Sequence, residues 1–278
     1  MNRYASIVCL CAGILIPRPA SALDIDLGAQ FGLGGDGSNP VWVGLNAGVN
    51  YESGGFAFDW LLHADSSGQF QSPFHGDYFG DFDVQIAHGF FSYASDPFSL
   101  VLGAKPSFDV VASPYSLFMS GRGLSIPGFA FSYQDERFLF REQWMLLGKD
   151  SDYGWPDRSA VIKTYGMKLG GLRFGFQDSS VASGTAFDPL DVLIPAPSFL
   201  IQYVALAPGR PWSVDSSALG TNKNCIMGFF ADYWADSWYA YAQLLVDNFN
   251  MNRFFKPDGP FNPDKLAFSA GGHYDLSG

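Results

Sequence analysis

The segment from Leu23 to Leu33 alternates between apolar residues at every odd position and polar residues or glycine at every even one. This alternation predicts a β-strand whose two faces differ in polarity. The same pattern recurs from Val41 to Tyr51 and from Phe56 to Asp65, where Phe58 and Asp59 fall on opposite faces. Successive two-faced strands with Asp and Gly on the less apolar face are typical of a membrane β-barrel whose apolar side faces outward.

The first 22 residues have the organisation of a secretory signal peptide. Arg3 supplies the positive charge, Ala5 to Ile16 form an apolar run, and Ala20-Ser21-Ala22 match a cleavage site with small residues. We therefore expect residues 1–22 to be removed on export and Leu23 to be the mature amino terminus.

Charge and cysteine content restrict the partners of the mature chain. Loss of Arg3 and Arg18 with the signal peptide leaves 14 basic and 27 acidic residues, a net charge of −13, and Cys225 as the sole thiol. The acidic balance argues against binding nucleic acid, and one thiol allows no intramolecular disulfide.

No apolar run after Leu23 reaches the roughly 20 residues of a spanning helix. An exported chain of this kind can be integral to a membrane only as a closed barrel.

The remaining sequence keeps the strand pattern. Alternation continues around Phe82, Val84 and Ile86 and from Phe98 to Lys105. Further apolar segments, separated by Gly, Pro, Asn, Asp and Ser, begin near Phe129, Phe138, Val161, Leu172, Phe199, Ile226, Trp238 and Leu266. We expect residues 23–278 to form one all-β domain, an antiparallel transmembrane β-barrel of about twelve to fourteen strands. The expected location is the outer membrane of a diderm bacterium, with outer-membrane lipid and the outer-membrane assembly machinery as partners.

Two long connections are candidates for recognition. They span Pro106 to Ile126 and Ala205 to Asn224. Long connections of a barrel usually face outward and carry binding residues. Aromatic side chains can stack on sugar rings and basic ones can bind acidic sugars, so the candidate glycan contacts are Tyr115, Arg122, Arg210 and Trp212.

Six acidic residues lie on the less apolar faces of the first strands. A barrel would direct them into its lumen: Asp24, Asp26, Asp59, Asp65, Asp81 and Asp83. There they would bias a pore toward cations, or hydrate the lumen and form ion pairs with Lys105, Arg141 or Arg173.

Motifs for catalysis or metal binding are absent from the sequence. The four histidines lie in separate segments, and Gly32 to Gly37 joins two expected strands, which favours a hairpin turn over a phosphate-binding loop. A barrel hydrolase would need Ser, His and an acid on adjacent strands, and no Ser motif of that kind occurs. We therefore expect no enzyme, cofactor or metal site.

The order of segments resembles a known family. It runs from Gly89-Phe90-Phe91-Ser92-Tyr93 through Asp188-Pro189-Leu190 to Leu245-Val246-Asp247-Asn248-Phe249. Over about Phe82 to Phe249 this resembles the capsule assembly Wzi family of outer-membrane barrels. The resemblance implies a large, surface-exposed barrel that binds or organises surface polysaccharide, as a cell-surface lectin does. The alternative is a general diffusion porin with an acidic lumen.

The final segment bears on closure of the barrel. Lys265 to Gly278 alternates as a membrane strand does, but it ends without an aromatic residue. Pairing of this segment with Leu23 to Leu33 would remove the open edges. Because the family is built from more strands than this length supplies, we expect instead a chain truncated at its carboxyl end, with an incomplete barrel.

Overall fold

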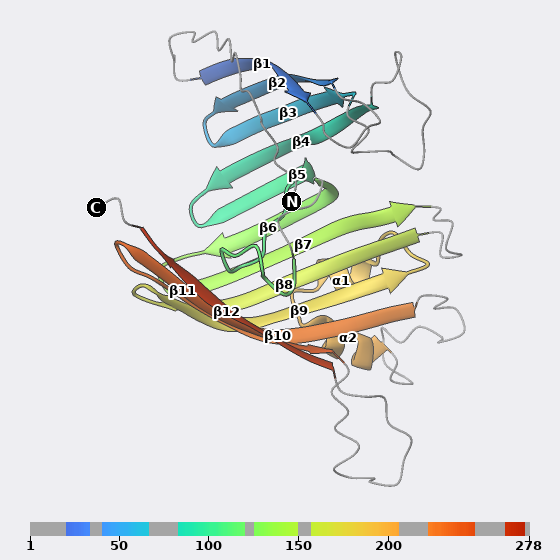
Figure 1. The fold of residues 1–278 in the computed structure, drawn as a ribbon. Coiled ribbons are helices and arrows are strands. Elements are labelled where there is room, and N and C mark those ends of the chain that lie inside the picture. The colour runs from blue at the N-terminus through green and yellow to red at the C-terminus, as the bar shows by residue number, and fades with distance from the viewer. Residues whose placement is uncertain are drawn as a thin grey trace. The chain divides into compact units, whose positions relative to one another are not determined.

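The fold is all-β in the computed structural model, which describes residues 21–33, 41–66, 83–119, 125–149, 157–205, 222–247 and 265–275. Twelve strands form one sheet in which every strand pairs with its neighbours in chain order (Figure 1). The strands are β1 Ser21–Leu33, β2 Val41–Ser53, β3 Phe56–Asp65, β4 Asp83–Ser95, β5 Phe98–Lys105, β6 Ile126–Gln134, β7 Phe138–Lys149, β8 Asp157–Leu169, β9 Leu172–Ser183, β10 Asn222–Trp234, β11 Trp238–Asp247 and β12 Lys265–Tyr274. Two short helices, α1 Pro189–Leu193 and α2 Ser198–Ala205, lie between β9 and β10.

The predicted all-β fold is confirmed, and the bounds of β3 and β5 coincide with the predicted segments. β1 begins at Ser21, two residues before the expected mature terminus. In the described strands the sheet is open, because it ends at β1 and β12 and these two are not paired with each other. Closure into a barrel therefore stays a prediction.

One predicted strand is wrong. The segment near Phe199 forms helix α2, in which the backbone N–H groups of Leu200 and Ile201 donate to the Pro197 carbonyl at 3.0 and 3.1 Å. The run Ser198–Ala205 has no apolar–polar alternation, and a short apolar run of this kind is compatible with either element. Asp188 of the Asp188-Pro189-Leu190 segment caps the start of α1, where the Leu190 N–H donates to its carboxylate at 2.9 Å.

The chain divides into two compact units, Met1–Ala94 with Val101–Lys105 and Ser95–Leu100 with Pro106–Gly278. In the first unit, the pairing of β1 to β4 places the predicted apolar positions of β1 to β3 on one face with Val84 and Ile86 of β4, whereas the predicted Phe82 lies outside the described residues. Ile25 pairs with Val49, and Val49 pairs with Trp60. Because side chains alternate between faces, the intervening residues, such as Asp26 and Asp59, share the opposite face. We call these two faces the apolar face and the polar face of the first unit.

In the second unit, different segments pack on the two faces of the sheet formed by β6 to β12. Residues Pro106–Met119, which we call the strap, lie on the face that includes Gln177 and Gln243. This is the strap face. The helices lie on the opposite face, which includes Lys163 and Asp178. This is the helix face.

The strap, which is part of the first long connection, folds back over the sheet. Its Val111 packs in a buried cluster with Leu139, Phe230, Tyr239 and Tyr241. A second cluster joins Met145, Ala160 and Ile162 of the strap face to Met119 and Ile126. Burial of these apolar side chains favours a connection that folds back over the sheet.

The connections alternate in length along the chain. Tight turns join β2 to β3, β4 to β5, β6 to β7, β8 to β9 and β10 to β11, whereas the intervening connections are longer. The turn between β2 and β3 contains Gly54 and Gly55 at φ 56° and 85°, a conformation that glycine adopts readily. Short turns at one end of the strands and longer loops at the other are typical of outer-membrane barrels. None of the helices in the described ranges is long and apolar enough to cross a bilayer.

Candidate functional site

The contacts between the strap and the sheet centre on the carboxylate of Asp109. It accepts hydrogen bonds from the side-chain amides of Gln177 and Gln243 at 2.7 and 3.1 Å. It also accepts from the backbone N–H groups of Phe118 and Met119 at 3.1 and 3.4 Å. One side chain of the strap therefore binds both the sheet and the far end of the strap itself.

Two glutamines, Gln177 of β9 and Gln243 of β11, meet across β10 below Asp109. The Gln243 amide also donates to the Gln177 side-chain oxygen at 3.0 Å, and the Leu117 N–H donates to the Gln243 side-chain oxygen at 2.9 Å. Both glutamines are almost fully buried. Buried polar groups that are hydrogen-bonded to one another in this way fix a single arrangement of the strap.

The remainder of the strap is bound by hydroxyl groups of β11 and β12. The Tyr239 hydroxyl accepts from the Ala112 N–H at 2.8 Å, and the Ser113 hydroxyl donates to the Tyr241 hydroxyl at 2.7 Å. The Ser269 hydroxyl donates to the Tyr115 carbonyl at 2.9 Å. The strap is thus attached along its length.

Two arginines bind strap carbonyls. Arg173 donates to the Val110 carbonyl at 3.2 Å and forms an ion pair with the buried Asp232. Arg141 donates to the Phe108 carbonyl at 3.0 Å. The expected ion pairs of Lys105, Arg141 or Arg173 with the acidic residues of the first strands stay a prediction.

A small pocket lies between the strap and the sheet, lined on its polar side by Asp109, Arg141, Gln143, Thr164 and Gln177. These side chains include no nucleophile paired with a general base. Within the residues that the structure describes, no group of three or more His, Cys, Asp or Glu residues could hold a metal ion. The strap can therefore cover part of the sheet, and the pocket lining can bind polar groups. The five polar lining residues supply no catalytic pair for a covalent reaction.

Three of the predicted lumen acids can be placed with their side chains. Asp24, Asp26 and Asp59 share the polar face of the first unit, as predicted. The Asp59 carboxylate lies 3.0 Å from His88 Nε2, a partner that the sequence reasoning did not identify. It could have been found from the strand register, because His88 pairs with Leu61, two residues from Asp59.

The other predicted site residues are only partly described. Asp65 and Asp83 are register partners on β3 and β4, and their side chains lie outside the described part of the structure. Asp81, Arg122, Arg210 and Trp212 also lie outside the described residues. Tyr115 is on the strap with 70% of its surface exposed.

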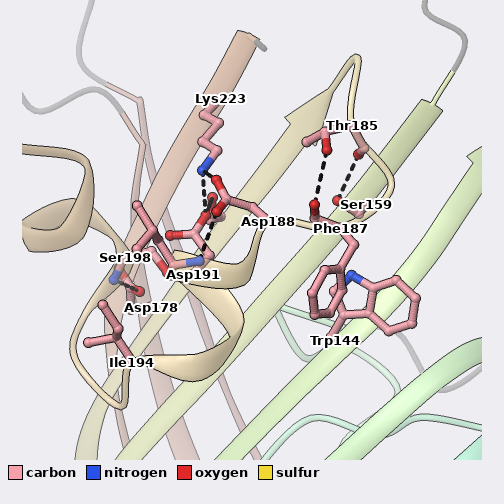
Figure 2. Close-up of polar contacts among 12 residues, drawn as sticks. Trp144, Ser159, Asp178, Thr185, Phe187, Asp188, Asp191, Ile194, Ser198 and Lys223 are labelled. Carbon is pink, nitrogen blue, oxygen red and sulfur yellow. Dashed lines mark hydrogen bonds and ion pairs between the residues drawn. The ribbon is translucent and has the colours of Figure 1, made fainter. Parts of the chain in front are cut away.

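A buried row of charges on the helix face was missed by sequence reasoning. Lys163 pairs across the strands with Glu142 on one side and Asp178 on the other. The Lys163 ammonium group donates to the Ile194 and Ala196 carbonyls at 2.8 and 2.9 Å. The Ser198 N–H donates to the Asp178 carboxylate at 2.5 Å (Figure 2). Residues 185–205, which we call the flap, therefore cover this row.

A second group of charged side chains binds the first part of the flap. Lys223 binds the carboxylates of both Asp188 and Asp191, the latter at 3.0 Å (Figure 2). Asp191 also accepts from the Ser180 hydroxyl at 3.0 Å. Burial acts to raise the pKa of Asp188, but the hydrogen bond and charge of Lys223 outweigh it and hold that pKa below its ordinary value. The ion pair is therefore charged at neutral pH.

Comparisons with protein-family models, with curated proteins and with solved structures found no match to this chain.

Proposed function

We propose that this protein is an outer-membrane β-barrel, exposed at the cell surface, that binds or organises surface polysaccharide. The main support is the sheet itself, an antiparallel meander in which each unit has a face with large, exposed apolar side chains. Its connections alternate between short turns and longer loops, as in outer-membrane barrels. The segment order that resembles the Wzi family supplies the polysaccharide as the proposed ligand.

The exposed apolar side chains need a non-aqueous environment. In the first unit they include Leu23, Ile25, Leu27, Ile86 and Phe91. On the helix face they include Phe138, Met167, Leu169, Phe229, Trp238, Leu266 and Phe268. A patch of this extent is unusual on a monomeric soluble protein, whereas lipid would cover it without cost. The proposal requires both open edges of the sheet to be paired in the membrane, because unpaired backbone groups in lipid are unfavourable.

The strap favours a polysaccharide-binding role over a wide diffusion pore. If the strap face borders the lumen, the strap fills part of it and is fixed there by buried hydrogen bonds. Tyr115, an exposed aromatic residue on the strap, is the proposed stacking contact for a sugar.

If the apolar face of the first unit lies in lipid, a new arginine should destabilise the protein more on that face than on the polar face. Leu27 is 61% exposed on the apolar face, and Asp26 is next to it on the polar face. Leu27→Arg should lower the free energy of unfolding in phospholipid vesicles by about 2–4 kcal/mol if the site is near the midplane, because a charge would then face lipid. Asp26→Arg should change it by less than about 1 kcal/mol. Urea titrations of both variants, monitored by tryptophan fluorescence, measure the difference.

A soluble protein would give another result. Arginine at an exposed position in water changes stability by only about 0.5 kcal/mol, so equal, small effects of the two variants would refute the membrane placement. Recovery of the wild-type protein in the soluble periplasmic fraction would refute it independently.

A narrow, cation-selective pore is the second candidate function. It is favoured by Asp24, Asp26 and Asp59 on one polar face, where fixed negative charge would attract cations. Single-channel recording in planar bilayers and binding of purified capsular polysaccharide, measured on the same refolded protein, separate the two. We expect little conductance and saturable binding that Tyr115→Ala weakens several-fold. Large, cation-selective conductance with no binding would favour the pore.

A further inference from the structure

The flap packs against the helix face, the same face that carries the exposed apolar side chains of β7 to β12. The Trp144 indole N–H donates to the Ala186 carbonyl at 3.1 Å, and the Trp144 ring meets Phe187 edge to face at 5.6 Å (Figure 2). Phe199 of α2 contacts Phe176 of β9 edge to face at 6.2 Å. The flap is thus a layer outside the sheet, not a loop that projects beyond it.

The flap encloses charges that would otherwise stand on an apolar surface. Lys163 is fully buried and donates to two flap carbonyls, and Asp178 accepts from the Ser198 N–H. Charged side chains directed at lipid are unfavourable. The flap therefore restores an apolar exterior over the one described stretch of the helix face that contains a row of charges.

The exterior of the flap is itself apolar. Leu193 is 73% exposed, Leu200 is 47% exposed and Phe187 is 44% exposed. The sequence from Val192 to Gly209 contains no Asp, Glu, Lys, Arg or His, although the whole chain is acidic. An apolar outer surface of this kind can enter the boundary between head groups and acyl chains without taking a charge out of water.

We propose that the flap is a lipid-binding element that lies in the interfacial region of the bilayer, with Leu193, Leu200 and Phe187 among the acyl chains. This inference rests on the proposed membrane location and adds a specific site to it. The occupant is lipid because the flap continues the exposed apolar face of the strands. The flap connects β9 to β10, so it starts and ends where these strands carry a longer connection, which places its two ends at one border of the apolar band.

Site-specific fluorescence quenching tests this placement. The native cysteines are replaced by serine, and a bimane label is attached to one new cysteine at a time in protein refolded into phosphatidylcholine vesicles. The flap sites are Leu193→Cys and Leu200→Cys. Phe268→Cys, on the exposed helix face of β12, is the control for lipid contact, and Glu136→Cys, in an exposed tight turn, is the control for water.

We expect lipids brominated near the head group to quench both flap labels, and iodide in the buffer to quench them several-fold less than the label at position 136. Strong quenching by iodide, with the position 268 label still quenched by brominated lipid, would overturn the flap proposal alone. Protection from iodide without quenching by lipid would also overturn it, since a protein would then cover the flap. Absence of lipid quenching at position 268 would refute the membrane location itself, and the flap proposal with it.

Discussion

Replacing Asp109 by leucine should lower the free energy of unfolding by about 3–5 kcal/mol and release the strap from the sheet. The substitution removes the acceptor shared by the Gln177 and Gln243 amides and by the Phe118 N–H. The two glutamines are almost fully buried and cannot turn to water. A buried donor left without a partner costs about 1–3 kcal/mol, and several lose their partner together.

Urea unfolding in vesicles gives the stability change, and hydrogen exchange at the Phe118 and Met119 amides reports release of the strap. Asp109→Asn keeps one side-chain oxygen as an acceptor and should lose less stability than the leucine variant. Asp26→Asn removes the same charge from the polar face of the first unit, where no strap contact is involved, and should be close to neutral. Unchanged exchange at both amides in Asp109→Leu would show that the strap is held by its apolar and tyrosine contacts instead.

The same variant bears on the proposed function. If the strap face borders the lumen, release of the strap should raise single-channel conductance above that of the wild-type protein. A released strap with unchanged conductance would mean that the strap does not obstruct a lumen.

The first strands could be predicted because each has one polar and one apolar face, and such a strand shows strict alternation of polar and apolar residues in its sequence. For β1 to β3 the observed register puts the predicted residues on the predicted faces. The alternation becomes indistinct from Leu139 to Leu147 and from Trp234 to Leu245. These strands have large apolar residues on both faces, because their strap face is covered too. Leu139, Tyr239 and Tyr241 pack against Val111 of the strap, and Met145 packs in the cluster with Met119 and Ile126.

The candidate site was less predictable, since it depends on contacts between distant segments. Asp109 and Gln243 are 134 residues apart in sequence and meet only because the strap folds back over the sheet. The long connection was assigned to recognition from its length and its Pro and Gly content, and neither feature shows that it carries buried apolar residues such as Val111. Similarly, the run Ser198–Ala205 is equally compatible with a strand and a helix until its packing on β9 is known.

Lys163→Met should also destabilise the protein by about 3–5 kcal/mol, because removal of one partner from a buried ionic group leaves the others uncompensated. The change removes the Lys163 donor from the Ile194 and Ala196 carbonyls, of which Ile194 keeps the hydrogen bond from the Ala196 N–H. It also leaves Glu142 and Asp178 without the cation between them. The flap should then detach from the helix face, which increased proteolysis between β9 and β10 would detect.

A matched lysine on the same strand separates this effect from simple loss of charge. Lys168 donates to the Asp135 carbonyl at 2.8 Å near a tight turn and is only half-buried, so Lys168→Met should cost less than about 1 kcal/mol. If uncompensated charge is the cause, adding Glu142→Gln to Lys163→Met should restore part of the lost stability. The Glu142 side chain has one buried oxygen without a hydrogen-bond partner, and the second substitution removes the charge that Lys163 had balanced. Independent, additive losses in the double variant would show instead that Lys163 acts through its two flap carbonyls alone.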